Sequence, residues 1–155
     1  ADIICPSVEL NIKQLKSIAC NYGSSMELVV YGQLPLMTLE YCPVSLITKC
    51  KNCNYQRAYG LKDDKGFVFP IICRQHKVQL LNSNVLFVVE DMDKIASIGV
   101  RRMRLDFYRE NSNDVKEIIS LYKNYKNLDQ HSRQEIIERI KKNGHTKGHY
   151  FRGVE

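Results

Sequence analysis

Short apolar runs and amphipathic stretches alternate at the start of the chain. Residues 2–5 and 26–31 are compact apolar runs, which predicts two short buried strands. From Asn11 on, apolar side chains recur at the spacing of one helical face as far as Gly23, which predicts a helix that ends at this glycine. A strand–helix–strand order predicts a βαβ unit, and therefore parallel strands.

The same alternation returns in the second half of the chain. Residues 85–89 and 100–108 are strand-like, and residues 91–98 between them have a short helical pattern that ends at Gly99. Two longer amphipathic stretches follow, and each begins with a residue pair of the capping-box type, which predicts where its helix starts. These pairs are Asp114 with Glu117 and Ser132 with Glu135.

The middle of the chain interrupts this alternation. Residues 33–75 contain three prolines and four cysteines, and a segment of this length is uncommon in a compact domain unless it is functional or cross-linked. A turn signal at residues 62–66 lies between two strand-like stretches and predicts a small hairpin. We therefore predict an α/β fold: a partial (β/α) barrel-like parallel sheet, in one domain of residues 1–155, with a cysteine-rich insert at residues 38–76.

Composition and charge narrow the class of protein. The 155 residues are 44% hydrophobic and 26% charged, which excludes a fully disordered chain. No apolar run approaches the roughly 20 residues of a membrane-spanning helix, and the N-terminus has no signal-peptide pattern, so we expect a cytoplasmic protein without a membrane partner. The formal net charge of +6 suits a polyanion such as RNA, although an ordinary basic surface also explains this charge.

Four of the six cysteines have a spacing that suits a metal centre. They are Cys42, Cys50, Cys53 and Cys73. A Cys-x-x-Cys pair can hold one metal ion from a tight turn, as in zinc ribbons and iron–sulfur sites. Four thiolates suit either zinc or a [4Fe–4S] cluster, and reduced thiols packed as small apolar side chains are the alternative. We expect that second role, as core residues, for Cys5 and Cys20.

Polar residues alternate with apolar ones along the strand predicted at residues 100–108. Arg102, Arg104 and Asp106 share one face of this strand. In a parallel barrel such a face can line the lumen near the mouth where substrates bind, whereas on an edge strand it is only solvated. Glu27 is a further carboxylate at a strand start, or an ordinary surface charge. The candidate catalytic residues are therefore Glu27, Arg104 and Asp106.

Basic and aromatic residues mix in the last segment of the chain. Residues 145–155 contain Tyr150 and Phe151 beside His149 and Arg152. Such mixtures bind phosphate groups and stack on nucleic-acid bases. We take His149 and Arg152 as candidate substrate-binding residues, and a disordered basic tail is the alternative.

Several motifs occur together in a recognisable order. They are Glu27–Met37 (ELVVYGQLPLM), Glu40–Pro43, the Cys50–Cys53 pair, Leu61–Phe67 and Thr146–Gly153. From Ser7 to the end the chain resembles the collagenase-like proteases, family number 32 of the peptidases of unknown mechanism. The resemblance implies an α/β barrel-like catalytic region that acts on peptide bonds. It also implies that this chain is its C-terminal part and that the missing N-terminal part of the same chain is a partner.

Two positions depart from the commoner pattern of that family. Tyr31 stands where His is common and Pro35 where Cys is common, so the chain is more similar to the long, clostridial-type branch. Relatives that act in tRNA and ubiquinone hydroxylation hold a [4Fe–4S] cluster on four cysteines with a different spacing. Three functions follow as alternatives: a collagenase-like peptidase, an iron–sulfur-dependent RNA-modifying (tRNA hydroxylation) enzyme, and a non-catalytic zinc-stabilised module.

Overall fold

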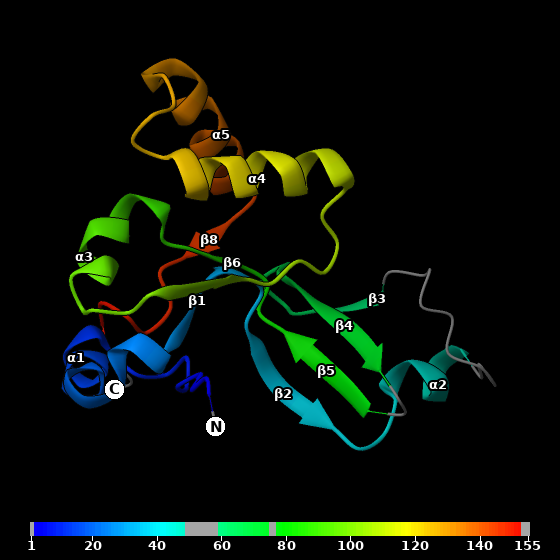
Figure 1. Ribbon diagram of the computed structural model, residues 1–155. Coiled ribbons are helices and arrows are strands. Elements are labelled where there is room, and N and C mark those ends of the chain that lie inside the picture. Colours follow the sequence, from blue (N-terminus) through cyan, green and yellow to red (C-terminus); the bar gives the residue numbers. More distant parts are fainter. Residues whose placement is uncertain (1, 49–58, 75–76, 153–155) are drawn as a thin grey trace. The chain divides into compact units, whose positions relative to one another are not determined.

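The computed structural model of the chain has an α/β architecture with two four-stranded sheets (Figure 1). It describes residues 2–48, 59–74 and 77–152. The chain divides into two compact units, of which the first is discontinuous in sequence. The first unit comprises Ala1–Gly32 with Asn84–Glu155, and the second comprises Gln33–Ser83. No helix in the described ranges is long and apolar enough to cross a membrane.

The sheet of the first unit has the strand order β7-β1-β6-β8. Its strands are β1 (Glu27–Gly32), β6 (Val85–Phe87), β7 (Arg102–Leu105) and β8 (His145–Thr146). β1 is parallel to β7 and β6 is parallel to β8, but β1 and β6 are antiparallel. The prediction of a purely parallel sheet is therefore wrong, and a partial barrel stays a prediction. The carboxyl ends of β1 and β7 consequently lie at the opposite edge of this sheet from those of β6 and β8.

The first predicted strand is reduced to a single bridge. Ile4 makes an isolated parallel β-bridge to Met26, with Ile4 N donating to Ser25 O at 2.8 Å. The helix that follows is confirmed. α1 (Ile12–Tyr22) begins at the N-cap Asn11, whose side chain accepts from Gln14 N, and ends at Gly23, where a 3₁₀ turn, η1 (Gly23–Ser25), continues. A side-chain oxygen at the N-cap stabilises the helix because the first backbone N–H groups have no partner within it.

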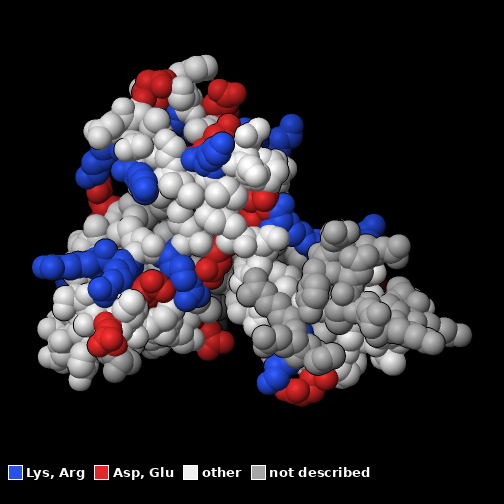
Figure 2. Space-filling model, turned by 45° about the vertical axis from the view of Figure 1, so that its right-hand side comes forward, with Lys and Arg blue, Asp and Glu red and all other residues white. Residues whose placement is uncertain are grey.

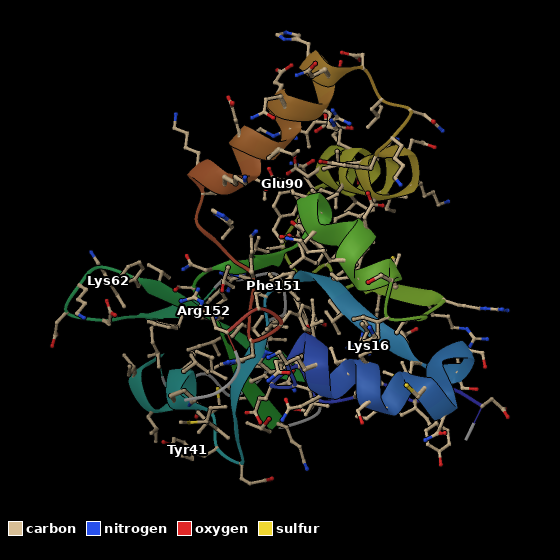
Figure 3. All side chains as sticks on the ribbon, turned by 90° about the vertical axis from the view of Figure 1, so that its left-hand side faces the viewer. Lys16, Tyr41, Lys62, Glu90, Phe151 and Arg152 are labelled. Atoms are coloured by element: carbon tan, nitrogen blue, oxygen red, sulfur yellow. The ribbon has the colours of Figure 1, made fainter. Side chains whose placement is uncertain are left out.

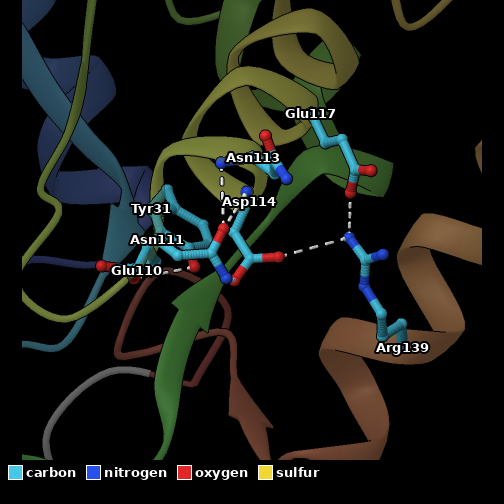
Figure 4. A network of polar contacts seen from close by, with 7 residues as sticks. All are labelled: Tyr31, Glu110, Asn111, Asn113, Asp114, Glu117 and Arg139. Carbon is cyan, nitrogen blue, oxygen red and sulfur yellow. Dashed lines mark hydrogen bonds and ion pairs between the residues drawn. The ribbon is translucent and has the colours of Figure 1, made fainter.

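Both long helices start three residues earlier than predicted. α4 (Ser112–Asn124) is capped by Asn111, and α5 (Gln130–Lys142) is capped by Asp129, so the predicted caps Asp114 and Ser132 lie inside the helices. Figure 4 shows Asn111 Oδ1 accepting from the backbone N–H groups of Asn113 and Asp114. Asn111 and Asp129 are each followed three residues later by another residue that can cap a helix. The local sequence therefore fits two different helix starts.

The α4 and α5 helices contribute the apolar face that covers β1 and β6. Their shared core consists of Tyr31, Phe87, Val89, Ile118, Leu121, Ile137 and Ile140. The Tyr122 hydroxyl donates to Val30 O at 2.7 Å and accepts from Val88 N at 3.3 Å, so one side chain joins α4 to β1 and to the residue after β6. The predicted helix at residues 91–98 is shorter: a 3₁₀ turn, η2 (Val89–Asp91), precedes α3 (Met92–Ala96).

The second unit is an antiparallel sheet with the order β2-β5-β4-β3. Its elements are β2 (Pro35–Leu39), α2 (Pro43–Thr48), β3 (Tyr59–Lys62), β4 (Val68–Arg74) and β5 (Lys77–Leu81). The predicted hairpin is confirmed by the pairing of β3 with β4. Asp63 Oδ1 stabilises its turn by accepting from Lys65 N at 3.0 Å and Phe67 N at 2.8 Å.

The C-terminal segment belongs to the first unit as far as it is described. β8 pairs with β6, and the buried Tyr150 hydroxyl donates to Val29 O at 2.6 Å. Lys147 Nζ donates to Asp91 Oδ2 at 2.6 Å. The alternative of a disordered tail is therefore wrong for residues 145–152, because strand pairing and a buried tyrosine hold this segment in place.

Asp91 is a buried carboxylate whose charge stabilises the first unit. Burial alone would raise its pKa, but the hydrogen bonds from Lys147 and Lys94 outweigh burial and hold the pKa below its ordinary value. An aspartate in the unfolded chain has a pKa of about 3.9, and the pKa of Asp91 in the folded protein is lower. The charged carboxylate therefore stabilises the fold above about pH 3.9, and this stabilisation is lost as the pH falls through the pKa of the folded protein. We expect Asp91→Asn to lower the free energy of unfolding by about 2 kcal/mol at neutral pH.

Urea unfolding at pH 7 and again at about pH 2 measures this contribution, and the difference from wild type should shrink at the lower pH. Asp93→Asn is the matched control, because Asp93 pairs with Lys126 and both side chains are exposed. Its effect should stay within about 0.5 kcal/mol. Equal effects of the two substitutions would contradict the role given to Asp91.

Candidate functional site

Two of the four predicted metal ligands meet in the second unit. Cys42 directly precedes α2, Cys73 lies near the end of β4, and their sulfur atoms are 3.8 Å apart. Both residues are half-buried against the core formed by Val44, Ile71 and Val78. Cys50 and Cys53 lie outside the described residues.

The distance between these two sulfurs can be compared with the geometry of metal sites. A thiolate lies about 2.3 Å from a zinc ion, so two thiolates at corners of a regular tetrahedron are about 3.8 Å apart. The Cys42 and Cys73 sulfurs have this separation. In a [4Fe–4S] cluster each cysteine binds a different iron, which holds the sulfurs further apart. Within the described ranges no group of three or more His, Cys, Asp or Glu side chains could hold a metal ion, so the two sulfurs form part of a site at most.

The structure brings the three candidate catalytic residues together in the first unit. Arg104 on β7 contacts Asp106 through two pairs of atoms, Nη2 to Oδ2 and Nε to Oδ1, each at 3.0 Å. Its Nη1 lies 3.5 Å from Glu27 Oε1 at the start of β1. The parallel pairing of β1 with β7 makes this contact possible, because it places Val29 opposite Arg104.

The electrostatics of this cluster hold Arg104 as a fixed cation. Burial alone would lower the pKa of Arg104, but the Asp106 carboxylate, and after it Cys5 and Glu27, raise it above its ordinary value. All three candidate side chains are partly exposed to solvent. Leu105 and Phe107, on the other face, pack against the core of the unit. The cluster can therefore offer guanidinium donors and carboxylate acceptors to a ligand at the surface.

Sequence reasoning missed the place of Cys5. It is exposed, not a core residue, and its sulfur lies 3.5 Å from Arg104 Nη1. Cys20, on α1, is also exposed, so both predictions of core cysteines are wrong. The physical reason at Cys5 is that residues 2–5 pair through one bridge and do not enter the sheet. Tyr150 lies near the same cluster: burial, followed by Cys5, raises its pKa.

A second residue missed from the sequence is Glu110, in the loop between β7 and α4 (Figure 4). Its carboxylate accepts from the Tyr31 hydroxyl at 2.9 Å and from the backbone N–H groups of Tyr108 and Arg109. Burial, and then the charge of Glu110, raise the pKa of Tyr31, which therefore stays a protonated donor. Tyr31 thus fastens the loop that follows Asp106 to the end of β1.

The candidate substrate-binding residues His149 and Arg152 lie in the C-terminal turn, where Arg152 N donates to His149 O at 3.3 Å. Figure 3 shows Arg152 next to Phe151 at the end of this segment. The Phe151 ring is partly exposed, and the ammonium groups of Lys94 and Lys147 lie 5.4 and 5.5 Å from its centroid. The cations beside this ring are thus Lys94 and Lys147, and the second aromatic residue of the segment, Tyr150, is buried. Substrate binding by His149 and Arg152 stays a prediction.

Comparison with known proteins adds one finding to this geometry. Residues 1–154 match the family described as Peptidase family U32. No curated protein and no solved structure matches the chain. The match covers nearly the whole sequence and confirms the family suggested by the motifs, whereas the clostridial-type branch stays a prediction.

Proposed function

We propose, from the premise that this chain belongs to peptidase family U32, that it is part of a collagenase-like peptidase with a four-thiolate metal centre. The centre consists of Cys42, Cys50, Cys53 and Cys73. The observation that carries this proposal is the 3.8 Å separation of the Cys42 and Cys73 sulfurs. An N-terminal part of the same protein completes the catalytic region, as the resemblance of the motifs implies.

The metal that suits this geometry best is a single zinc ion. Four thiolates around zinc leave no open coordination position, so the ion would stabilise the fold of the second unit and would not bind substrate. A [4Fe–4S] cluster is the alternative on the same ligands. The four cysteines fit either group in their donor atoms, and the sulfur separation favours zinc.

Metal analysis of protein purified without oxygen tests this centre. We expect about one zinc ion per chain in wild type, a strong loss in Cys73→Ser, and no change in the control Cys20→Ser. Iron together with absorbance at about 400 nm would instead support the cluster. Protein that carries neither metal would contradict the proposal.

The substrate surface of the proposed peptidase is the cluster of Glu27, Arg104 and Asp106. The Arg104 guanidinium is held by Asp106 in a fixed plane and can donate to a peptide carbonyl. A carboxylate beside it can accept a proton from an attacking water molecule. Asp106 is the better placed of the two carboxylates for orienting Arg104, because its contacts are shorter than that of Glu27.

Arg104→Lys in the intact protein should lower kcat/KM for peptide cleavage by about tenfold to a hundredfold, since an ammonium cannot keep the two contacts to Asp106. Arg102→Lys is the matched control on the same strand face. Arg102 is exposed, and its Nη1 donates a long hydrogen bond to Ser24 O at 3.3 Å. Cleavage rates on a fluorogenic peptide measure both variants. Equal cleavage rates for the two variants would contradict the assignment of Arg104 to the substrate surface.

RNA modification is the second candidate function. Lys94 and Lys147 beside the partly exposed Phe151 ring favour it, as does the net charge of +6. Acidic and basic side chains are nevertheless interspersed over the face shown in Figure 2. Binding of tRNA that weakens steeply with salt, and weakens further in Lys147→Gln, would support this function over peptide cleavage.

A further inference from the structure

We propose that Cys42 and Cys73 become joined by a disulfide when the protein meets hydrogen peroxide, and that this disulfide and a bound metal ion exclude each other. The second half rests on the proposed function, because it requires the four-thiolate centre. The first half rests only on the two described cysteines and their surroundings.

The geometry of the pair needs little change to form the bond. The sulfurs are 3.8 Å apart and a disulfide requires about 2.05 Å, so they must approach each other by under about 2 Å. The backbone at both cysteines is fixed by hydrogen bonds or strand pairing. Cys42 O accepts from Ser45 N at 3.1 Å and Ser45 Oγ at 2.7 Å, and Cys73 is paired with Val78 in the sheet.

The surroundings of this pair differ from those of the other described cysteines. Cys5 and Cys20 are exposed, and the sulfur of Cys5 contacts Arg104, not another sulfur. Cys42 and Cys73 are half-buried, so a peroxide molecule can reach a sulfur while the second thiol is already in contact. An oxidised sulfur at this position therefore meets a thiol before it meets a further oxidant molecule.

The reaction balances with hydrogen peroxide as the only oxidant. One thiolate attacks a peroxide oxygen, the O–O bond breaks, and the products are a sulfenic acid and hydroxide, which takes up the thiol proton as water. The second thiol attacks the sulfenic sulfur, its S–O bond breaks, and a second water leaves. Two thiols lose two electrons and two protons, and one peroxide becomes two waters.

The disulfide removes two thiolate donors at once. A metal ion at the four-cysteine centre would keep at most two protein ligands, and its binding free energy falls accordingly. Conversely, a bound ion holds both sulfurs as ligands and protects them from peroxide. Metal loss should therefore follow oxidation of this pair, and a thiol reductant should restore metal binding.

Peptide mapping by mass spectrometry without reductant tests the disulfide, and a colorimetric zinc chelator follows the metal in the same samples. After peroxide treatment we expect one major cross-link, between the peptides that contain Cys42 and Cys73, and one metal ion released per cross-link. Cys20→Ser should leave both results unchanged, whereas Cys42→Ser should abolish the cross-link.

The outcomes separate this inference from the proposed function. A major cross-link between Cys50 and Cys53, or reduced Cys42 and Cys73 after Cys5 and Cys20 have fully reacted, would overturn the inference. Wild type that forms the Cys42–Cys73 cross-link but never holds a metal would support the disulfide and overturn the metal centre. If the metal ion stays bound after the Cys42–Cys73 cross-link has formed, the disulfide and the metal ion do not exclude each other, and that part of the inference is wrong.

Discussion

Replacing Cys53 by serine is expected to release the metal ion of the proposed four-thiolate centre and to unfold much of the second unit, while the first unit keeps its structure. The second unit has a small core, with Val44, Ile71 and Val78 as its buried cluster. The free energy of binding a structural zinc ion, roughly 10–16 kcal/mol in zinc-finger peptides at neutral pH, is also folding free energy. Loss of one thiolate should therefore cost this unit several kcal/mol.

Hydrogen exchange followed by mass spectrometry measures each unit separately, and metal analysis runs beside it. Amides of β4 and β5 should lose protection in Cys53→Ser, and those of β1 and α4 should keep it. Cys20→Ser is the control, since Cys20 is exposed on α1 in the first unit. Unchanged metal content in Cys53→Ser would contradict the assignment of Cys53 as a metal ligand.

Replacing Gly32 by alanine is expected to destabilise the first unit by roughly 3 kcal/mol or more, because strain and a backbone clash coincide there. Gly32 has φ +126°, a conformation that favours glycine. A Cβ at this position would clash with the backbone oxygen of Asp106 and would lie 2.9 Å from the Asp106 Cβ. The Asp106 backbone cannot yield freely, since Asp106 N donates to Tyr31 O at 2.9 Å.

Gly99→Ala is the matched control for this effect. Gly99 also has a positive φ, +94°, but nothing lies within 4 Å of the added Cβ. Its cost should be the conformational strain alone, about 1 kcal/mol. Urea unfolding measures both variants. The same loss of stability in the two would show that strain, and not the close approach of Asp106, accounts for Gly32.

The close approach also connects the fold to the candidate site. Asp106 must move if Gly32 gains a side chain, and its two contacts to Arg104 would then be lost. We therefore expect Gly32→Ala to impair the proposed substrate surface of Glu27, Arg104 and Asp106 even at temperatures where the unit stays folded.

Local patterns in the sequence were sufficient for elements whose cause is local. The apolar face of α1 and its end at Gly23 were predicted from residues within one helix, and the structure has this helix in place. The turn around Asp63 fixes the β3–β4 hairpin in the same way, through bonds to residues within four positions. The starts of α4 and α5 were predicted three residues too late, because Asn111 and Asp129 fit the same signature as the residues three positions later.

At the candidate sites, local sequence patterns predict residue types but not the contacts between distant residues. Alternation along residues 100–108 placed Arg104 and Asp106 on one face, and the spacing of the cysteines marked Cys42 and Cys73 as two of four metal ligands. The contact from Arg104 to Glu27 depends on the parallel pairing of β7 with β1, and the sulfur contact depends on α2 packing against β4 and β5. These contacts join residues 77 and 31 positions apart in the chain.

The sequence by itself determined the family, the α/β class, helix α1, the approximate positions of α3, α4 and α5, and the residue types of the candidate sites. Only the tertiary structure decided that β6 runs against β1, that Cys5 is exposed beside Arg104, and that the C-terminal segment is held by Tyr150. The physical reason is the range of the interactions. Helix caps, turns and side-chain periodicity depend on neighbouring residues, whereas strand direction and burial depend on which apolar faces pack together across the whole unit.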